Sequence, residues 1–204
     1  MSKTIAIDIN DTLRDNISQF RRCYQKFIDP SFEIENEDVT NFDFSEIFPF
    51  EDKDAFNSFK YIDCPFELFG RAEPMDKMLP YRLGDWLQNT LRDLDEEDIP
   101  NVMMVSPFEL GLTIQSTLSF LARIGIRCRE YYFPIDSSTI WDKCDILITA
   151  NPYLINSCPE GKTVIKITTP YNKEVETEHT FNSLMNVIQD PEDTIVNMLI
   201  SEEE

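Results

Sequence analysis

Five short apolar runs are spaced along the chain and predict the strands of a buried sheet. Four of them are continuous or nearly continuous aliphatic stretches, as expected for parallel strands that are covered on both faces. The predicted strands are residues 4–8 (TIAID), 101–106 (NVMMVS), 127–133 (RCREYYF), 145–149 (DILIT) and 163–168 (TVIKIT).

Amphipathic segments between these runs predict helices. In residues 109–126, Gly125 is expected to end a helix. The apolar positions expected on one face of that helix are Leu110, Ile114, Leu118, Leu121 and Ile124. Residues 77–94 predict a second helix, with Pro80 in its first turn. Its apolar stripe is formed by Leu83, Trp86, Leu87 and Leu91.

The last segment, residues 183–204, predicts two short helices separated at Pro191. Strands that alternate with helices indicate an α/β fold with a doubly wound parallel sheet. Such a sheet binds its ligands beyond the carboxyl ends of its strands. The residues that follow each predicted strand are therefore the candidates for a functional site.

One long segment interrupts the alternation between the first two strands. It begins with a predicted helix at residues 15–28 and continues as an acidic, phenylalanine-rich stretch. A crossover of this length is expected to form a structure of its own. We therefore predict a mainly helical cap at residues 15–77 and a Rossmann-like core at residues 1–14 and 78–204. Most of the cap phenylalanines are expected to pack its own core, and a partner-binding surface is the alternative.

The acidic charge narrows the range of partners. The chain has 38 acidic and 18 basic residues among 204, a formal net charge of −20. Such a surface repels nucleic acid and anionic membranes, so we expect neither as a partner. The N-terminal sequence lacks a signal peptide, and no apolar run is long enough to cross a membrane. The five cysteines form no CxxC pair, which predicts reduced thiols in a cytoplasmic protein.

Polar residues follow the predicted strands at the expected ligand-binding edge. Asp8, Asn10 and Asp11 follow the first strand, and Ser106 ends the second. An aspartate on a sharp turn after a strand can attack phosphorus as a nucleophile. That reaction also needs a cation and a second acid. The single histidine, His179, argues against a Ser-His-Asp triad.

Three stretches together resemble the motifs of the haloacid dehalogenase-like superfamily. They are IAIDINDTLRDN (5–16), NVMMVS (101–106) and KCDILITANPYLI (143–155), followed by the similar tail GKTVIKITTPYNKE (161–174). Their order and spacing resemble the 5′-nucleotidase and 5′(3′)-deoxyribonucleotidase branch, including small phage-encoded members. The resemblance implies a Rossmann-like core with a cap inserted after the first strand.

The resemblance also implies roles for individual residues. Asp8 falls on the nucleophile, and Asn10 falls on the second aspartate, which is the general acid/base. The positions that the resemblance links to phosphate are Thr12, Ser106 and Lys143. Thr149 and Ala150 fall on the paired acids that hold the metal ion.

Two of these motifs have lost acids that the chemistry requires. Asn10 cannot donate a carboxylic proton, and the loss of a positioned acid/base typically lowers a rate by about 10²–10⁴-fold. Thr149 offers only a neutral oxygen and Ala150 offers none, so Asp8 and Asp11 remain as weak metal ligands. Asp145 is a poor substitute for the lost metal ligands, because it lies at the start of its strand, about 13 Å from the catalytic edge at roughly 3.3 Å per residue.

Two further acids could supply a metal ligand from loops at the same edge. They are Glu109 and Asp136. Glu109 is interpreted instead as an acid in the first turn of a helix, where it is favourable to the helix dipole.

Two functional hypotheses follow from the losses. The first is a pseudoenzyme with a binding, accessory or structural role, which holds a nucleotide or phosphate ligand or joins protein partners in a larger assembly. The second is an active, Mg²⁺-dependent nucleoside-monophosphate phosphatase that forms an aspartyl-phosphate on Asp8. Metal-free substitution at carbon, as in haloalkanoate dehalogenases of the same superfamily, is a formal third option. If the chain is phage-encoded, its expected location is the host cytoplasm or the virion.

Overall fold

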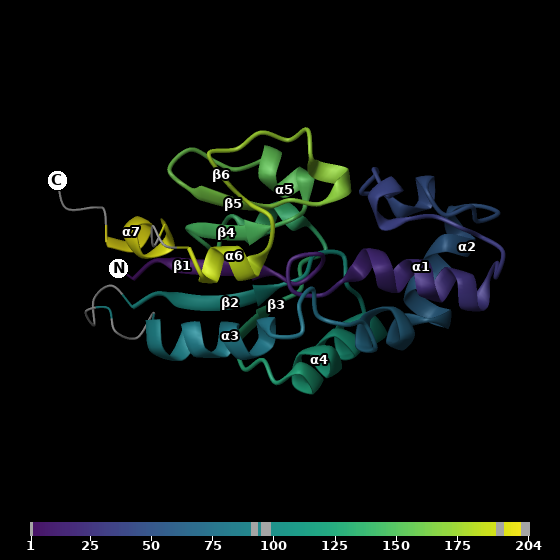
Figure 1. Ribbon diagram of the computed structural model, residues 1–204, viewed down its shortest axis with the longest axis horizontal. Helices are drawn as coiled ribbons and strands as arrows, with labels where there is room; N and C mark the ends of the chain where they lie inside the picture. The colour runs from purple at the N-terminus through teal and green to yellow at the C-terminus, as the bar shows by residue number, and fades with distance from the viewer. Residues whose placement is uncertain (1, 91–93, 95–98, 191–193, 201–204) are drawn as a thin grey trace.

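The computed structural model describes residues 2–90, 94, 99–190 and 194–200. Its centre is a six-stranded sheet in the order β3-β2-β1-β4-β5-β6, in which every neighbouring pair is parallel (Figure 1). The strands are β1 Thr4–Asp8, β2 Asn101–Val105, β3 Glu130–Tyr132, β4 Ile146–Thr149, β5 Thr163–Ile167 and β6 His179–Phe181. The α/β fold class and the parallel sheet predicted from the sequence are confirmed.

Helices cover both faces of this sheet. The helices are α1 Asn16–Phe27, α2 Lys53–Ser58, α3 Leu79–Asp85, α4 Leu112–Ile124, α5 Pro152–Asn156, α6 Leu184–Ile188 and α7 Thr194–Ile200. Short 3₁₀ turns span Asn36–Asp38, Phe44–Glu46, Ser137–Ile140 and Pro170–Asn172, and π-helical turns span Phe59–Asp63, Phe66–Gly70 and Trp86–Thr90. No helix among the described residues has the length and apolar character needed to cross a membrane.

The side chains of each strand alternate between two hydrophobic layers. In β1, Ile5 and Ile7 join a layer that includes residues of α3, α4, α6 and α7. Ala6, between them, joins the opposite layer with residues of α5 and the turn Ser137–Ile140. Because both faces are covered, nearly every strand residue near the sheet centre is apolar. This pattern allowed the strands to be predicted from the sequence.

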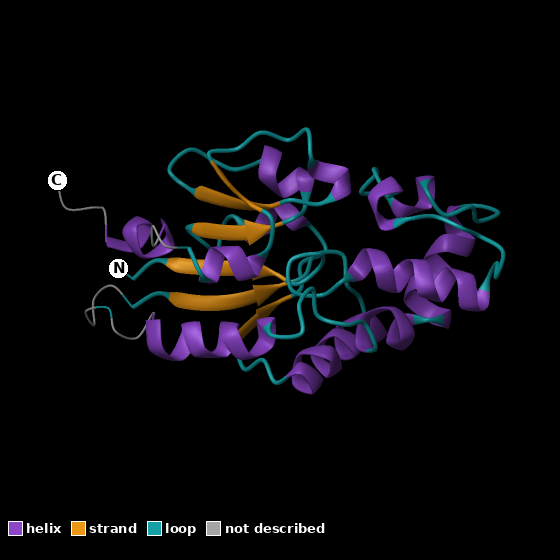
Figure 2. Cartoon of the chain, viewed as in Figure 1, coloured by secondary structure: helices purple, strands orange, loops and turns teal. Residues whose placement is uncertain are grey.

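A third hydrophobic cluster lies outside the two sheet layers. It is built from α1 and the segment that follows it, up to Phe69, and phenylalanine rings dominate it. Phe20 of α1 is central, with ring centroids of Phe48 and Phe44 at 4.8 and 5.2 Å. We call the rings around Phe20 the phenylalanine cluster. In Figure 2 the strand arrows point toward the helices of this segment, so it lies beyond the carboxyl edge of the sheet.

Most predicted element positions agree with the structure. The two C-terminal helices are α6 and α7, and Pro191 between them is outside the described residues. Pro80 lies in the first turn of α3, and Leu83 and Trp86 are buried, while Leu91 is not among the described residues. Gly125 ends α4 with a φ of 82°, in the left-handed region that favours glycine. All five cysteines are free thiols.

Two sequence predictions about elements are wrong. The strand β6 was missed, because the residues around His179 are polar and an edge strand need not be apolar. The buried face of α4 was also misassigned. Leu110 and Leu118 are exposed, whereas Thr113 and Thr117 are fully buried. The Thr117 hydroxyl accepts a hydrogen bond from a buried arginine, which is described below, and the Thr113 hydroxyl bonds to the backbone of Leu110 before the helix.

Candidate functional site

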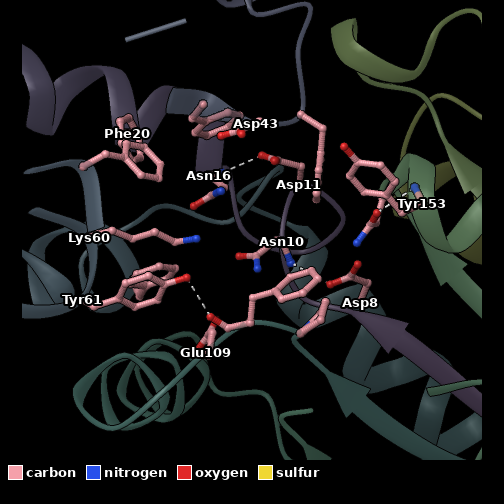
Figure 3. Close-up of a pocket in the computed structure, with 17 residues that line it drawn as sticks. Asp8, Asn10, Asp11, Asn16, Phe20, Asp43, Lys60, Tyr61, Glu109 and Tyr153 are labelled. Atoms are coloured by element: carbon pink, nitrogen blue, oxygen red, sulfur yellow. Dashed lines mark hydrogen bonds between the residues drawn. The ribbon is translucent and has the colours of Figure 1, made fainter. Parts of the chain in front are cut away.

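A cavity of about 280 Å³ lies at the carboxyl edge of the sheet, under the phenylalanine cluster (Figure 3). The core lines it with residues from the loops after β1, β2 and β4. These include Asp8, Asn10, Asp11, Glu109, Asn151 and Tyr153. The segment from α1 up to α3, which we call the cap segment, lines the opposite side mainly with rings. Its lining residues include Phe20, Phe42, Asp43, Phe44, Phe56, Lys60 and Tyr61. The predicted ligand-binding edge of the sheet therefore faces this cavity.

Asp8, the last residue of β1, is almost completely buried at this edge. The Thr149 hydroxyl donates to Asp8 Oδ2 at 2.7 Å, and the Asn10 backbone N–H donates to Oδ1 at 3.3 Å. Burial raises the pKa of Asp8 to about 7, because desolvation outweighs the hydrogen bond from Thr149. A sizeable fraction of Asp8 is thus protonated near neutral pH, which weakens it as a nucleophile.

Asn10 holds two neighbouring loops together. Its Nδ2 donates to Ser106 Oγ at 3.0 Å. Its Oδ1 accepts from Arg14 Nε at 3.1 Å and also from Arg14 Nη2. Both ends of the amide are therefore engaged with protein groups. The structure brings Asn10, Asp8 and Ser106 together, as the sequence predicted.

Arg14 and Glu109 form a buried ion pair behind Asn10. The side chains are 0% and 1% exposed, and Arg14 Nη2 lies 2.7 Å from Glu109 Oε1. Ser106 Oγ donates to the same Glu109 oxygen at 2.7 Å. We call Asn10, Arg14, Ser106 and Glu109 the edge network. It links the loops after β1 and β2 through one continuous set of hydrogen bonds.

Arg14 also ties the core to the cap. Its Nη1 donates to Thr117 Oγ1 of α4 at 2.6 Å and to the Phe69 carbonyl oxygen at 3.2 Å. The guanidinium carbon lies 4.8 Å from the centroid of the Phe69 ring, a cation–π distance. Sequence reasoning missed Arg14. The only available signal was a cation directly after the first motif, and its partners are remote in the chain.

The interpretation of Glu109 as a first-turn acid is wrong. Helix α4 begins only at Leu112, so Glu109 lies before its first turn. The Phe108 N–H donates to the Pro134 carbonyl oxygen. Phe108 has a φ of 62°, so the chain turns sharply after Ser106. This turn directs the Glu109 carboxylate inward to Arg14 rather than toward the helix end.

Asp11 caps a helix. Its Oδ1 accepts from the N–H groups of Asn16 and Ile17 at 2.9 and 3.0 Å, at the start of α1. Its Oδ2 accepts from the Tyr171 hydroxyl at 3.0 Å. Burial raises the pKa of Asp11 to about 7, although these hydrogen bonds oppose the rise. Both oxygens have protein partners, which makes Asp11 a poor metal ligand.

Thr12, Thr149 and Ala150 are all fully buried. The Thr12 hydroxyl, which the resemblance links to phosphate, has no hydrogen-bond partner in the protein. Thr149 lies beside Asp8 as predicted, but as a hydrogen-bond donor. Ala150 packs within the hydrophobic layer of the sheet.

Lys143 is not at the site, and its predicted role is wrong. It precedes β4 and is not among the residues that line the cavity; it lines a separate surface pocket with Arg129 and Tyr132. The Lys143 ammonium lies 5.1 Å from the Tyr132 ring centroid. The lysine that lines the cavity is Lys60, which extends from the cap toward the middle of the space in Figure 3.

Asp136 does not reach the cavity either. It is exposed and accepts from the N–H of Ser138 at 3.0 Å, at the start of the turn Ser137–Ile140. Asp136 thus caps a local turn.

The residues at the edge do not fit a Mg²⁺ ion. Among the residues that the structure describes, no three His, Cys, Asp or Glu side chains gather into a possible metal site. Asp8 is bound by Thr149, and Asp11 is bound by helix N–H groups and Tyr171. A hard cation prefers several oxygen ligands, with carboxylates among them. Here the neighbouring donors are a hydroxyl, an amide and carboxylates that are already engaged.

Comparisons with known proteins support the fold. No protein-family model matches the sequence, and no curated protein matches it. Two solved structures of a dehalogenase, one of them with an intermediate complex, align with TM-scores of 0.51. The first is 12% identical and covers 99% of this chain and 98% of its own; the second is 13% identical and covers 91% and 95%.

A third similar structure is the HAD-hydrolase YfnB from Bacillus subtilis bound to magnesium. It aligns with a TM-score of 0.55 at 13% identity, over 96% of this chain and 99% of its own. Together with the parallel sheet and its topology, these matches show that the chain has the haloacid dehalogenase-like fold. Identity this low defines the fold alone, so the activity must be argued from the residues of the site.

Proposed function

We propose that the protein is a haloacid dehalogenase-like pseudoenzyme that binds a small molecule in its cavity without transforming it. The observation that carries this proposal is the Glu109 carboxylate, 2.7 Å from the Ser106 hydroxyl. Ser106 is the group that the sequence resemblance assigns to phosphate. A phosphate oxygen at this hydroxyl would compete with Glu109 for the same proton and would meet a negative charge.

The cations near the edge support the same conclusion. The Arg14 charge is already paired with Glu109 inside the protein, and the pair is fully buried. Lys143, which the resemblance assigned to the phosphate, lies elsewhere. Lys60 is the one cation that lines the cavity among the described residues, so a phosphoryl group bound beside Asp8 would have a single lysine for the neutralisation that phosphoryl transfer requires.

The side chains at the catalytic positions also support the proposal. Asn10 is an amide fixed by Arg14 and Ser106, so it can neither protonate a leaving group nor activate water. Arg14, which is paired with Glu109, offsets little of the desolvation of Asp8, and the pKa of Asp8 is about 7. The nucleophile, the acid/base and the metal site are therefore all weakened, at the ends of two strands, β1 and β4.

The alternative function is a Mg²⁺-dependent 5′-nucleotidase that acts through an aspartyl-phosphate on Asp8. The observation in its favour is that Asp8 remains at the end of β1 and lines the cavity. Magnesium in the YfnB structure belongs to that protein. This alternative would require Asp8 to bind a metal ion while its two oxygens give up the hydrogen bonds described above.

A direct assay separates the two functions. The purified protein is incubated with Mg²⁺ and with p-nitrophenyl phosphate or a panel of nucleoside monophosphates, beside the variant Asp8→Asn. We expect no turnover above that of the variant. Turnover that Asp8→Asn abolishes would refute the pseudoenzyme proposal.

A second experiment asks whether the fold still supports catalysis. The variant combines Asn10→Asp, Thr149→Asp and Ala150→Asp with Glu109→Gln, which removes the competing charge at Ser106. Phosphatase activity gained by this variant would support loss of an ancestral activity. The triple variant that retains Glu109 is the matched control and is expected to remain weaker.

A further inference from the structure

We propose that the cavity binds an unphosphorylated planar heterocycle that carries an N–H donor and a carbonyl acceptor. This inference rests on the proposed binding function and specifies the class of ligand. Three features of the cavity carry it: unpaired polar atoms on the core side, aromatic walls, and the sign of the surrounding charge.

The first feature is an unpaired donor. Asn151 is 2% exposed and lines the cavity. Its Oδ1 accepts from the N–H groups of Tyr153 and Leu154 at the start of α5, which fixes the orientation of the amide. Its Nδ2 has no partner. A buried N–H group without an acceptor is unfavourable by roughly 1–3 kcal/mol, and a ligand carbonyl oxygen would satisfy it.

The second unpaired atom is an acceptor on the same side. Glu109 Oε1 receives two donors, from Arg14 and Ser106, whereas Glu109 Oε2 receives none. A buried carboxylate oxygen without a donor is strongly unfavourable. A ligand N–H group would relieve it. The residues on the core side thus include one unpaired donor, after β4, and one unpaired acceptor, after β2, and a ring that carries both an N–H and a carbonyl group has the complementary groups.

Aromatic rings line both sides of the cavity. Phe20, Phe44, Phe56 and Phe69 contribute from the cap segment, and Phe108 and Tyr153 contribute from the core. Flat apolar faces favour a flat ring, which can stack or pack edge to face against them. The volume of about 280 Å³ lies just below the usual range for ligand pockets, roughly 300–1,000 Å³. It is suited to a compact ring system.

The charges around the cavity disfavour a phosphate group. Asp8, Asp11, Asp43 and Glu109 line it, against one lining cation, Lys60, among the described residues. The hydrogen bond from the Ser45 hydroxyl lowers the pKa of Asp43, so this acid stays ionised. Lys60 interacts with Asp43, and this offsets part of its charge. A dianionic ligand would meet more negative than positive groups, whereas a neutral heterocycle would not.

The test is binding to the full-length protein, measured by NMR titration and saturation transfer. The probes are hypoxanthine, cytosine and nicotinamide, each beside its 5′-mononucleotide. We expect at least one free heterocycle to bind and its mononucleotide to bind at least about tenfold more weakly. Tighter binding of the mononucleotides, or binding of none of the heterocycles, would overturn this inference.

Two variants test the contacts. Asn151→Asp keeps the oxygen that caps α5 but replaces the free donor with an acceptor. We expect it to weaken heterocycle binding by about tenfold or more, since a lost hydrogen bond leaves two unmatched acceptors. Asn156→Asp makes the same chemical change at the exposed end of α5 and is the matched control. Equal affinities for the two variants would overturn the assignment of Asn151.

Glu109→Gln provides a second probe of the core side. It keeps an oxygen for Arg14 and Ser106 but turns the free acceptor into a donor, so binding of an N–H-bearing ring should fall by about tenfold. Unchanged affinity in folded Glu109→Gln would overturn the role of Oε2. These readings are independent of the phosphatase assay. Turnover dependent on Asp8 would refute the pseudoenzyme proposal, whereas the order of affinities tests the ligand class.

Discussion

Two groups of side chains beside the cavity, the edge network and the phenylalanine cluster, are of opposite kinds. On the core side, the edge network of Asn10, Arg14, Ser106 and Glu109 consists of buried polar groups that bond to one another, with Glu109 Oε2 left without a donor. On the cap side, the phenylalanine cluster around Phe20 has no charge and packs ring against ring. The core side has a directional hydrogen-bond pattern, so one altered residue leaves a buried group unpaired. The phenylalanine cluster is stabilised by close packing, so a smaller side chain there leaves a cavity.

Under the proposed function, this contrast explains how the site would lose its chemistry and keep its fold. The groups of the edge network still fill the sheet edge and hold the loops together, but they do so by bonding to one another. Arg14 reaches both Thr117 of α4 and the carbonyl of Phe69, so the same network anchors the cap. The network therefore acts as a structural joint between the two sides of the cavity.

Arg14→Met should have the largest effect on stability. It leaves the Glu109 carboxylate buried without its cation, and breaking a buried pair in this way typically lowers the free energy of unfolding by about 3–5 kcal/mol. Urea unfolding measures the loss. The double variant Arg14→Met with Glu109→Met removes both charges and should recover most of it. A single-variant loss below about 1 kcal/mol would contradict the structural role of the pair.

Phe20→Ala should have the next largest effect, on the cap side. The ring is 3% exposed and contacts several other phenylalanines. Its removal should lower the free energy of unfolding by about 3 kcal/mol, near the low end for such truncations because neighbouring rings can partly fill the space. Urea unfolding and near-UV circular dichroism follow it. Phe27→Ala, at a ring that is 44% exposed, is the control and should change stability by less than about 1 kcal/mol.

The free energy of unfolding should depend on pH through the buried carboxyl groups of the core side, and the direction can be stated. The pKa of Asp8 is raised from 3.8 to about 7 in the folded protein, so the folded state binds a proton more tightly than the unfolded state. The resulting stabilisation is full below the unfolded pKa and is lost as the pH rises through 7. Between pH 5 and pH 8 we expect a loss of about 2 kcal/mol from this residue.

Urea unfolding across that pH range measures the effect. Asp8→Asn removes the titrating group but keeps an oxygen that can accept from Thr149, so it should reduce the slope. Asp11 also has a pKa of about 7 and should account for part of the remaining slope. A protein that becomes more stable from pH 5 to pH 8 would show that these carboxyl groups are not the dominant titrating groups.

Thr149→Val should have the smallest effect and tests one contact of Asp8. The substitution keeps the shape of the side chain but removes the hydroxyl that donates to Asp8 Oδ2 at 2.7 Å. We expect a loss of about 1 kcal/mol at pH 8 and less at pH 5, because the hydroxyl stabilises the ionised carboxylate. It should also raise the pKa of Asp8 further, which NMR titration of the carboxyl group detects. An unchanged titration would argue against this hydrogen bond.

Much of the sheet could be predicted from sequence because its signal is local. Each central strand is covered on both faces, so its apolar run is continuous and stands out from its surroundings. Asp8 and Ser106 could be assigned to one edge because parallel strands end at the same side of a sheet. The end of α4 at Gly125 was equally local, since a left-handed backbone angle favours glycine.

The edge strand β6 and the buried face of α4 could not be predicted in this way. The residues of β6 are partly exposed at the sheet edge and lack an apolar run. Thr117 of α4 is buried because Arg14 needs its hydroxyl, a reason that does not exist within the helix itself. A local hydrophobic pattern cannot report a polar partner from another part of the chain.

The sequence by itself determined the strands, the edge at which a ligand would bind, and the absence of acids at positions 10, 149 and 150. The tertiary structure decided which charged groups lie at this edge and how they pair. Arg14 and Glu109 are 95 positions apart, and only folding makes them a buried pair. Folding also put Lys143 away from the site and brought Lys60 to the cavity. The physical reason is that charge pairing inside a protein depends on distance and burial, which sequence spacing does not encode for remote residues.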